Sequence, residues 1–160
     1  MPLSPFLILG YGNRSRGDDA LGGLFLDAIA PQLDNRQFEI LEDFQLNIEH
    51  ALDINGRQLV LLVDAALDLN APYRFSEVKP LAELGYTSHA MSPEALLALC
   101  QRLEPATLPP VFLLAIEGRD FALGAELGAT AHENLRQALH FAGLLLEIPR
   151  AAAWRAQLTP

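Results

Sequence analysis

Three side chains that could together bind a metal ion are spread along this sequence, at Asp19, Asp64 and His89. Asp64 directly follows a run of apolar residues, and a lone carboxylate at the end of a buried strand is costly unless it is hydrogen-bonded, paired or metal-bound. His89 precedes a predicted helix, and imidazole is the commonest protein ligand for mid-series divalent metals. Two carboxylates and one imidazole leave coordination positions open, which is typical of an exchangeable Zn, Ni or Mn site.

The loop that ends in Asp18 and Asp19 favours a cation over a phosphate group. Its glycines begin a dinucleotide-binding pattern, but the third glycine position is Ser15, and Asp18 stands where a phosphate-binding loop needs lysine. Adjacent helical residues point about 100° apart, so one acid of the pair should face the site. We assign Asp18 to capping the following helix and Asp19 to the site; the reverse assignment, and a role of both as caps only, stay open.

Five segments predict the strands that would position these residues. Four are apolar throughout or nearly so, which is typical of strands covered on both faces, and the fifth alternates as an edge strand with one wet face does. They are residues 6–10, 38–41, 59–63 and 111–116, and the alternating segment 73–78.

The segments between the strands have the apolar spacing of helices. Ser92, Pro93 and Glu94 form a strong helix start. The predicted fold class is α/β: a three-layer sandwich with a twisted, mostly parallel five-stranded sheet, one edge strand antiparallel and helices on both faces. Sites in such sheets lie outside the carboxyl ends of the strands. The predicted helices are residues 20–29, 46–54, 93–103 and 125–147.

Length and composition place limits on organisation and partners. The 160 residues predict one α/β domain over 1–149 and a flexible C-terminal tail over 150–160, with Trp154 its only candidate anchor. A net charge of −9 disfavours nucleic acid, and no polybasic run favours a membrane surface. A single cysteine excludes an internal disulfide and a cysteine-rich zinc site. With no signal peptide or spanning segment recognised, we expect a cytoplasmic monomer.

The motifs at the strand ends resemble those of the hydrogenase maturation endopeptidases. The likeness rests on Gly10-Tyr11-Gly12-Asn13, Gly17-Asp18-Asp19, Val63-Asp64-Ala65-Ala66 and Ser88-His89 before an amphipathic helix. It extends from Pro5 to about Leu146.

This resemblance implies a peptidase that removes the C-terminal extension of a nickel–iron hydrogenase large-subunit precursor after nickel insertion. The partner would be the nickel-loaded precursor, and nickel would arrive with that substrate; zinc or cadmium would occupy the same site in vitro. The metal-binding set of the family maps onto Asp19, Asp64 and His89. Whether these residues also act in catalysis stays open.

One departure from the family pattern follows the second predicted strand. Many members carry an Asp-Gly-Gly-Thr-like turn there, whereas this chain has Glu42-Asp43-Phe44-Gln45. We therefore expect Glu42 or Asp43 to line the substrate cleft.

Three other functions remain possible from the sequence. One is a nickel-handling chaperone without protease activity, another is a flavodoxin-like or receiver-like module that binds a divalent cation, and the third is a small-molecule hydrolase. Conventional protease mechanisms lack support, because Cys100 lies among leucines in a predicted helix and there is no H-E-x-x-H motif.

Overall fold

The computed structural model describes residues 2–82 and 91–160, and its centre is a five-stranded sheet. The strand order is β2-β1-β3-β5-β4. Four neighbouring strands run parallel, and β4 pairs antiparallel with β5 at one edge, so the predicted fold class is confirmed. The strands are β1 (Phe6–Tyr11), β2 (Phe38–Asp43), β3 (Leu59–Ala66), β4 (Tyr73–Val78) and β5 (Val111–Glu117).

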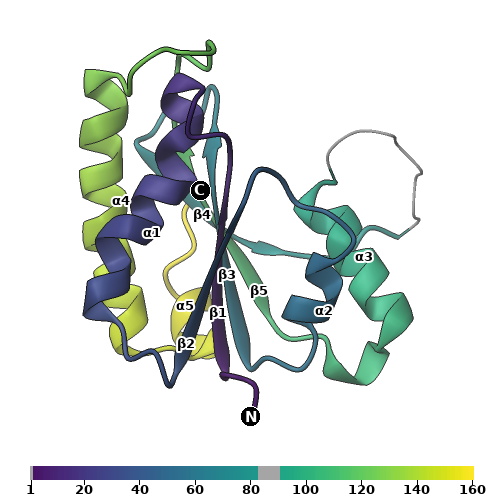
Figure 1. Cartoon of the computed structure of the whole chain (residues 1–160). Coiled ribbons are helices and arrows are strands. Elements are labelled where there is room, and N and C mark those ends of the chain that lie inside the picture. The colour runs from purple at the N-terminus through teal and green to yellow at the C-terminus, as the bar shows by residue number, and fades with distance from the viewer. Residues whose placement is uncertain (1, 83–90) are drawn as a thin grey trace.

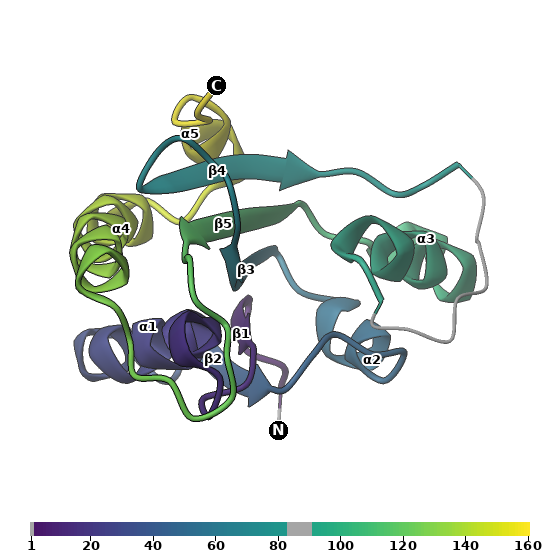
Figure 2. The same ribbon diagram turned by 90° about the horizontal axis from the view of Figure 1, so that it is seen from above.

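Helices cover both faces of the sheet. The α1 and α4 helices lie on one face with the short α5, and α2 and α3 lie on the other (Figures 1 and 2). No helix among the described residues combines the length and the apolar character needed to cross a bilayer. The helices are α1 (Leu21–Ile29), α2 (His50–Ile54), α3 (Pro93–Leu103), α4 (Ala129–Glu147) and α5 (Ala151–Arg155), with 3-10 turns at Gly17–Ala20, Ala30–Gln32 and Pro105–Thr107.

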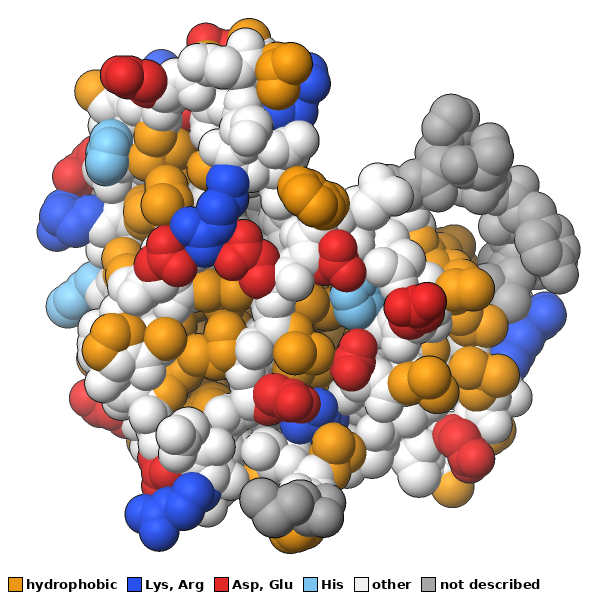
Figure 3. Space-filling view, viewed as in Figure 1, with side chains coloured by type: hydrophobic (Ala, Val, Ile, Leu, Met, Phe, Trp, Pro, Cys, Tyr) orange, Lys and Arg blue, Asp and Glu red, His pale blue; other side chains and the backbone are white. Residues whose placement is uncertain are grey.

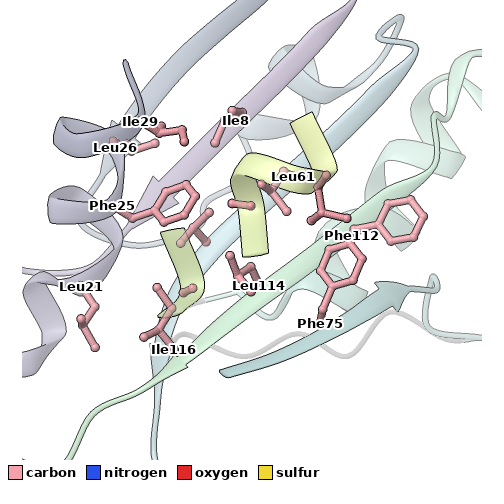
Figure 4. Packing of buried hydrophobic residues seen from close by; sticks show 14 of the residues in the cluster. Ile8, Leu21, Phe25, Leu26, Ile29, Leu61, Phe75, Phe112, Leu114 and Ile116 are labelled. Atoms are coloured by element: carbon pink, nitrogen blue, oxygen red, sulfur yellow. The ribbon is translucent and has the colours of Figure 1, made fainter. Parts of the chain in front are cut away.

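Each face of the sheet has its own apolar core, because side chains of the central strands alternate between the two faces. On the α1 and α4 side, Phe25 packs against strand residues such as Ile8 and Leu114 (Figure 4). On the α2 and α3 side, Leu9 and Leu62 contact helix residues that include Leu97. The sheet is therefore fixed from both sides, and its carboxyl edge is a rigid base for a site.

Two helices begin later than the sequence spacing predicts. The helix expected from residue 46 starts at His50, because Leu46 and Asn47 are irregular and Ile48 and Glu49 form a turn before it. The helix expected from residue 125 starts at Ala129, after Gly128 in an extended conformation. Apolar periodicity reports which face is buried and does not locate the first helical residue.

The C-terminal residues 150–160, expected to be a flexible tail, pack onto the domain. They form α5, and Trp154 is only 2% exposed and donates its indole N–H to the Leu145 carbonyl oxygen at 2.9 Å. Arg155 pairs with Glu77 at 2.8 Å. Buried aromatic area and an ion pair outweigh the entropy of a short tail, so this expectation was wrong.

Candidate functional site

Asp64 lies at the carboxyl edge of the sheet, as predicted. It stands near the end of β3, paired with Ala115 of β5, and its Oδ1 accepts a hydrogen bond from the Ala65 N–H at 2.8 Å. On its other side is β1, where Gly10 pairs with Val63, so the next residue, Tyr11, continues to the level of Asp64. Residues at one level of a parallel sheet point to the same face, so Tyr11 and Asp64 both face α2 and α3.

Asp19 lies in the 3-10 turn Gly17–Ala20 that precedes α1. Its Oδ2 accepts a hydrogen bond from the Asn13 N–H at 2.7 Å, which closes the glycine-rich loop onto the acid. Gly12 makes this closure possible, because its φ is +142° and a Cβ there would lie 2.2 Å from the Asp19 carbonyl oxygen. The loop thus fixes Asp19 at the mouth of the sheet.

Asp18 has a structural role, but a different one from the helix cap that we predicted. Its carboxylate is 2% exposed and accepts backbone N–H groups of Arg119 (2.7 Å), Asp120 (3.2 Å) and Gly128 (2.9 Å). Burial would raise its pKa, but these three hydrogen bonds outweigh burial and hold the pKa below its usual value. Asp18 therefore ties the β5–α4 loop to the start of α1 and makes no cap bond to its own helix.

Asp19 lies close enough to Asp64 for its charge to act on that carboxyl group. The pKa of Asp64 is raised to about 7, first by burial and further by the charge on Asp19. A largely buried carboxylate beside a second negative charge is stabilised by a cation close to both. The structure thus brings together two of the three predicted ligands.

Tyr11 belongs to this site and was not singled out by the sequence. Its side chain is 8% exposed and donates a hydrogen bond to Asp64. Burial first, and then the nearby charges of Asp64 and Glu94, raise the tyrosine pKa, so the hydroxyl stays protonated. Its position as the last residue of the first strand, directly after the Gly10–Val63 pair and therefore beside Asp64, was the available signal.

His89, the third predicted ligand, lies outside the described residues. The helix start predicted just after it is confirmed: α3 begins at Pro93, and the Ser92 hydroxyl accepts the Ala95 N–H at 3.1 Å. Within residues 2–82 and 91–160, no three His, Cys, Asp or Glu side chains are grouped closely enough to hold a metal ion.

Glu42 and Asp43, expected to line a cleft, are both engaged by neighbouring side chains. Glu42 accepts two hydrogen bonds from Arg14, each 2.7 Å long. Arg14 also bonds both carboxylate oxygens of Asp27, at 2.7 and 2.9 Å, and so joins the glycine-rich loop to β2 and α1. Asp43 lies 3.2 Å from Nε2 of the buried His50. These acids therefore support the loop that holds Asp19.

Cys100 is buried, in agreement with its expected place in the core. Burial raises the pKa of its thiol to about 11, so the sulfur is protonated at neutral pH and a poor nucleophile. Within the described chain, the reactive groups at the sheet edge are carboxylates and one phenol.

Solved structures similar to this chain are proteases of hydrogenase maturation. The NiFe hydrogenase maturation protease HycI from Thermococcus kodakarensis aligns with a TM-score of 0.70 and 20% identity, over 90% of this chain and 93% of that one. The hydrogenase maturating endopeptidase HybD from E. coli aligns with a TM-score of 0.69 and 22% identity, over 89% and 92%.

This chain has the fold of the hydrogenase maturation proteases. HybD from Thermococcus kodakarensis has it too, with a TM-score of 0.65 and 19% identity over 88% of this chain and 97% of that one. No family model and no curated protein matches the sequence. The maturation-protease fold agrees with the architecture implied by the resemblance in the sequence motifs.

Proposed function

We propose that this protein is an endopeptidase that removes the C-terminal extension of a nickel–iron hydrogenase large-subunit precursor after nickel has been inserted. In this proposal Asp19, Asp64 and His89 bind the nickel carried by the substrate. The observation that carries it is the position of two neighbouring carboxylates, Asp19 and Asp64, at the carboxyl edge of a maturation-protease fold.

The chemistry of the acid pair fits recognition of a cation that arrives with the substrate. Without a cation, burial and the charge of Asp19 keep the pKa of Asp64 near 7, so ionisation of Asp64 costs free energy. A divalent ion offsets that cost. Because the site leaves coordination positions open, the ion can remain bound to ligands that the precursor supplies. Binding is thereby conditional on nickel insertion.

The protein groups around the acids hold them in place for this role. The Ala65 N–H and the Tyr11 hydroxyl donate to Asp64, and the Asn13 N–H donates to Asp19. Ligands that are hydrogen-bonded in this way are orientated before the ion arrives, which raises affinity. The bound cation would polarise the peptide carbonyl or lower the pKa of a water molecule for its attack.

The test is the mass of the nickel-loaded precursor after incubation with the wild type and with three variants, Asp19→Asn, Asp64→Asn and His89→Ala. We expect loss of the C-terminal peptide with the wild type, and rates reduced about 100-fold in each variant, because the two asparagines remove negative charge from the metal site and His89→Ala removes a ligand. Asp68→Asn is the matched control. Asp68 is an exposed acid with a φ of 56°, which asparagine also adopts, and it lies four residues beyond Asp64.

Two results would contradict the proposal. Cleavage at the wild-type rate by all three variants would remove these residues from the reaction. An unchanged precursor mass with the wild type, together with tight binding of the nickel-loaded precursor, would instead establish the nickel-handling chaperone.

A further inference from the structure

The edge strand β2 has unpaired backbone groups along its outer side. The Phe6 N–H donates to the Gln37 carbonyl and the Gly12 N–H to the Asp43 carbonyl. The backbone N–H and C=O groups of the odd-numbered residues of β2 are therefore directed toward β1. The backbone N–H and C=O groups of the even-numbered residues are directed away from β1, toward the open edge. The N–H groups of Ile40 and Glu42, and the carbonyls of Phe38, Ile40 and Glu42, have no partner among the described residues.

At the opposite edge of the sheet, the middle of β4 is paired with the C-terminal segment. On β4, the Phe75 N–H donates to the Thr159 hydroxyl at 2.9 Å, and the Phe75 carbonyl accepts the Thr159 N–H at 3.0 Å. The C-terminal residues thus cover the middle of the β4 edge, whereas the described residues leave the edge of β2 open. An open edge is a template for the addition of another strand.

The open edge leads to the candidate site. Its carboxyl end, Asp43, accepts the N–H of Gly12, which packs against Asp19. Its amino end, Phe38, lines a groove of about 710 Å³ together with apolar residues of α1 and α4, among them Ile29 and Leu139. Figure 3 shows apolar side chains gathered in a hollow on this face of the molecule. A six-residue strand spans about 20 Å, so one extended segment reaches both ends.

The net charge of the chain argues for a foreign segment on this strand and against a second copy of this chain. The sequence of β2 is FEILED, with three acids and no basic residue. Glu39 and Glu42 are paired with Arg57 and Arg14, so their charges are partly offset, but the whole chain carries a net charge of −9 and two copies therefore repel one another. A segment with neutral or basic side chains has no such penalty.

We propose that the outer edge of β2 binds an extended segment of the protein substrate by strand addition, with neutral or basic side chains beside Glu39, Glu42 and Asp43. This inference rests on the proposed function, because it takes the precursor as the partner. Main-chain hydrogen bonds to Ile40 and Glu42 supply affinity that depends little on sequence, and the groove at Phe38 takes an apolar side chain. The added strand brings the substrate chain to the edge where Asp19 and Asp64 lie.

Residue-resolved amide hydrogen exchange tests the proposal directly. The probe is a synthetic peptide that covers the C-terminal extension of the precursor and the residues before it, added to the wild-type protein. We expect exchange of the Ile40 and Glu42 amides to slow at least about tenfold. The amides of Glu39 and Leu41 already donate to β1, so their exchange stays unchanged and serves as the internal control.

A variant pair gives an independent test. Ile40→Pro removes an outward N–H, which an edge strand tolerates, and should weaken peptide binding at least about tenfold. Ile40→Val keeps the N–H and should bind as the wild type does. If Ile40→Pro does not fold, as judged by thermal unfolding, the exchange pattern of the wild type decides.

Three outcomes overturn the inference. They are peptide binding that leaves Ile40 and Glu42 amide exchange unchanged, no detectable peptide binding, and protection of these amides by increasing concentrations of this chain alone, which would mean self-pairing. Cleavage of the nickel-loaded precursor is measured separately. Cleavage without amide protection contradicts only the strand addition, whereas protection without cleavage contradicts only the peptidase.

Discussion

A Cβ atom on Gly12 would lie 2.2 Å from the carbonyl oxygen of Asp19. The glycine also has a φ of +142°, which side-chain-bearing residues rarely adopt. The position of Asp19 therefore depends on the absence of a side chain at residue 12.

The first prediction concerns this contact. Gly12→Ala should lower the free energy of unfolding by about 2–3 kcal/mol and displace Asp19, because the backbone must move to relieve the overlap. Urea unfolding measures the loss of stability. Gly143→Ala is the control: this α4 glycine has open space around it, so alanine should stabilise the helix by about 0.5–1 kcal/mol. Equal effects of the two substitutions would refute the role of Gly12.

The second prediction concerns the bonds from Asp18 to the β5–α4 loop. Asp18→Ala should cost about 2–4 kcal/mol of stability at pH 7, since a carboxylate that accepts three N–H groups is removed. The pKa of Asp18 is lowered, so this contribution is present above its unfolded pKa and is lost as the pH falls through the folded pKa. The unfolding curves of wild type and variant should therefore differ at about pH 7 and become similar at low pH. A constant difference at both pH values would contradict this.

The third prediction follows from the raised pKa of Asp64, which is about 7. Between the unfolded pKa, about 4, and the folded one, the native state binds more protons, so wild-type stability falls as the pH rises across that window. Asp64→Asn cannot ionise and keeps an acceptor for the Ala65 N–H. It should be more stable than the wild type by about 2–4 kcal/mol above pH 8 and differ little near pH 4. Metal-free denaturation curves across this range provide the check, and a variant less stable than wild type at high pH would be inconsistent with it.

The fourth prediction concerns Arg14, whose guanidinium joins Glu42, Asp27 and the Gly23 carbonyl. Arg14→Lys loses the fork geometry, so the loop should loosen although overall stability changes by only about 1 kcal/mol. Exchange of the Asn13 amide, which donates to Asp19, should quicken about tenfold. Arg16→Lys, an exposed change in the same loop, should leave that exchange as in the wild type. Unaltered Asn13 exchange in Arg14→Lys would show that the loop is held by other contacts.

The sheet was predictable because its central strands are continuously apolar. Runs such as 59–63 and 111–116 can only be covered on both faces, and their ends then locate Asp64. The first strand is apolar in the same way, so the glycine-rich loop after it, with the acid pair Asp18 and Asp19, could be placed at the same edge of the sheet.

The partners of the individual residues were not predictable from local patterns. Asp18 bonds N–H groups more than 100 residues away, and no periodicity reports such a pairing. The packing of Trp154 and the bond from Tyr11 to Asp64 likewise depend on which elements meet in space. Spacing predicts the buried face of an element, whereas its contacts follow from the assembled fold.

The most direct test of the central claim is a competition between two forms of the precursor in one tube. Isotopically labelled nickel-loaded precursor and unlabelled nickel-free precursor are mixed in equal amounts with the wild-type protein, and intact masses are followed over time. Our account predicts loss of the C-terminal peptide from the labelled, nickel-loaded form alone. Equal cleavage of both forms would contradict recognition of nickel by Asp19, Asp64 and His89, and cleavage of neither would contradict the peptidase itself.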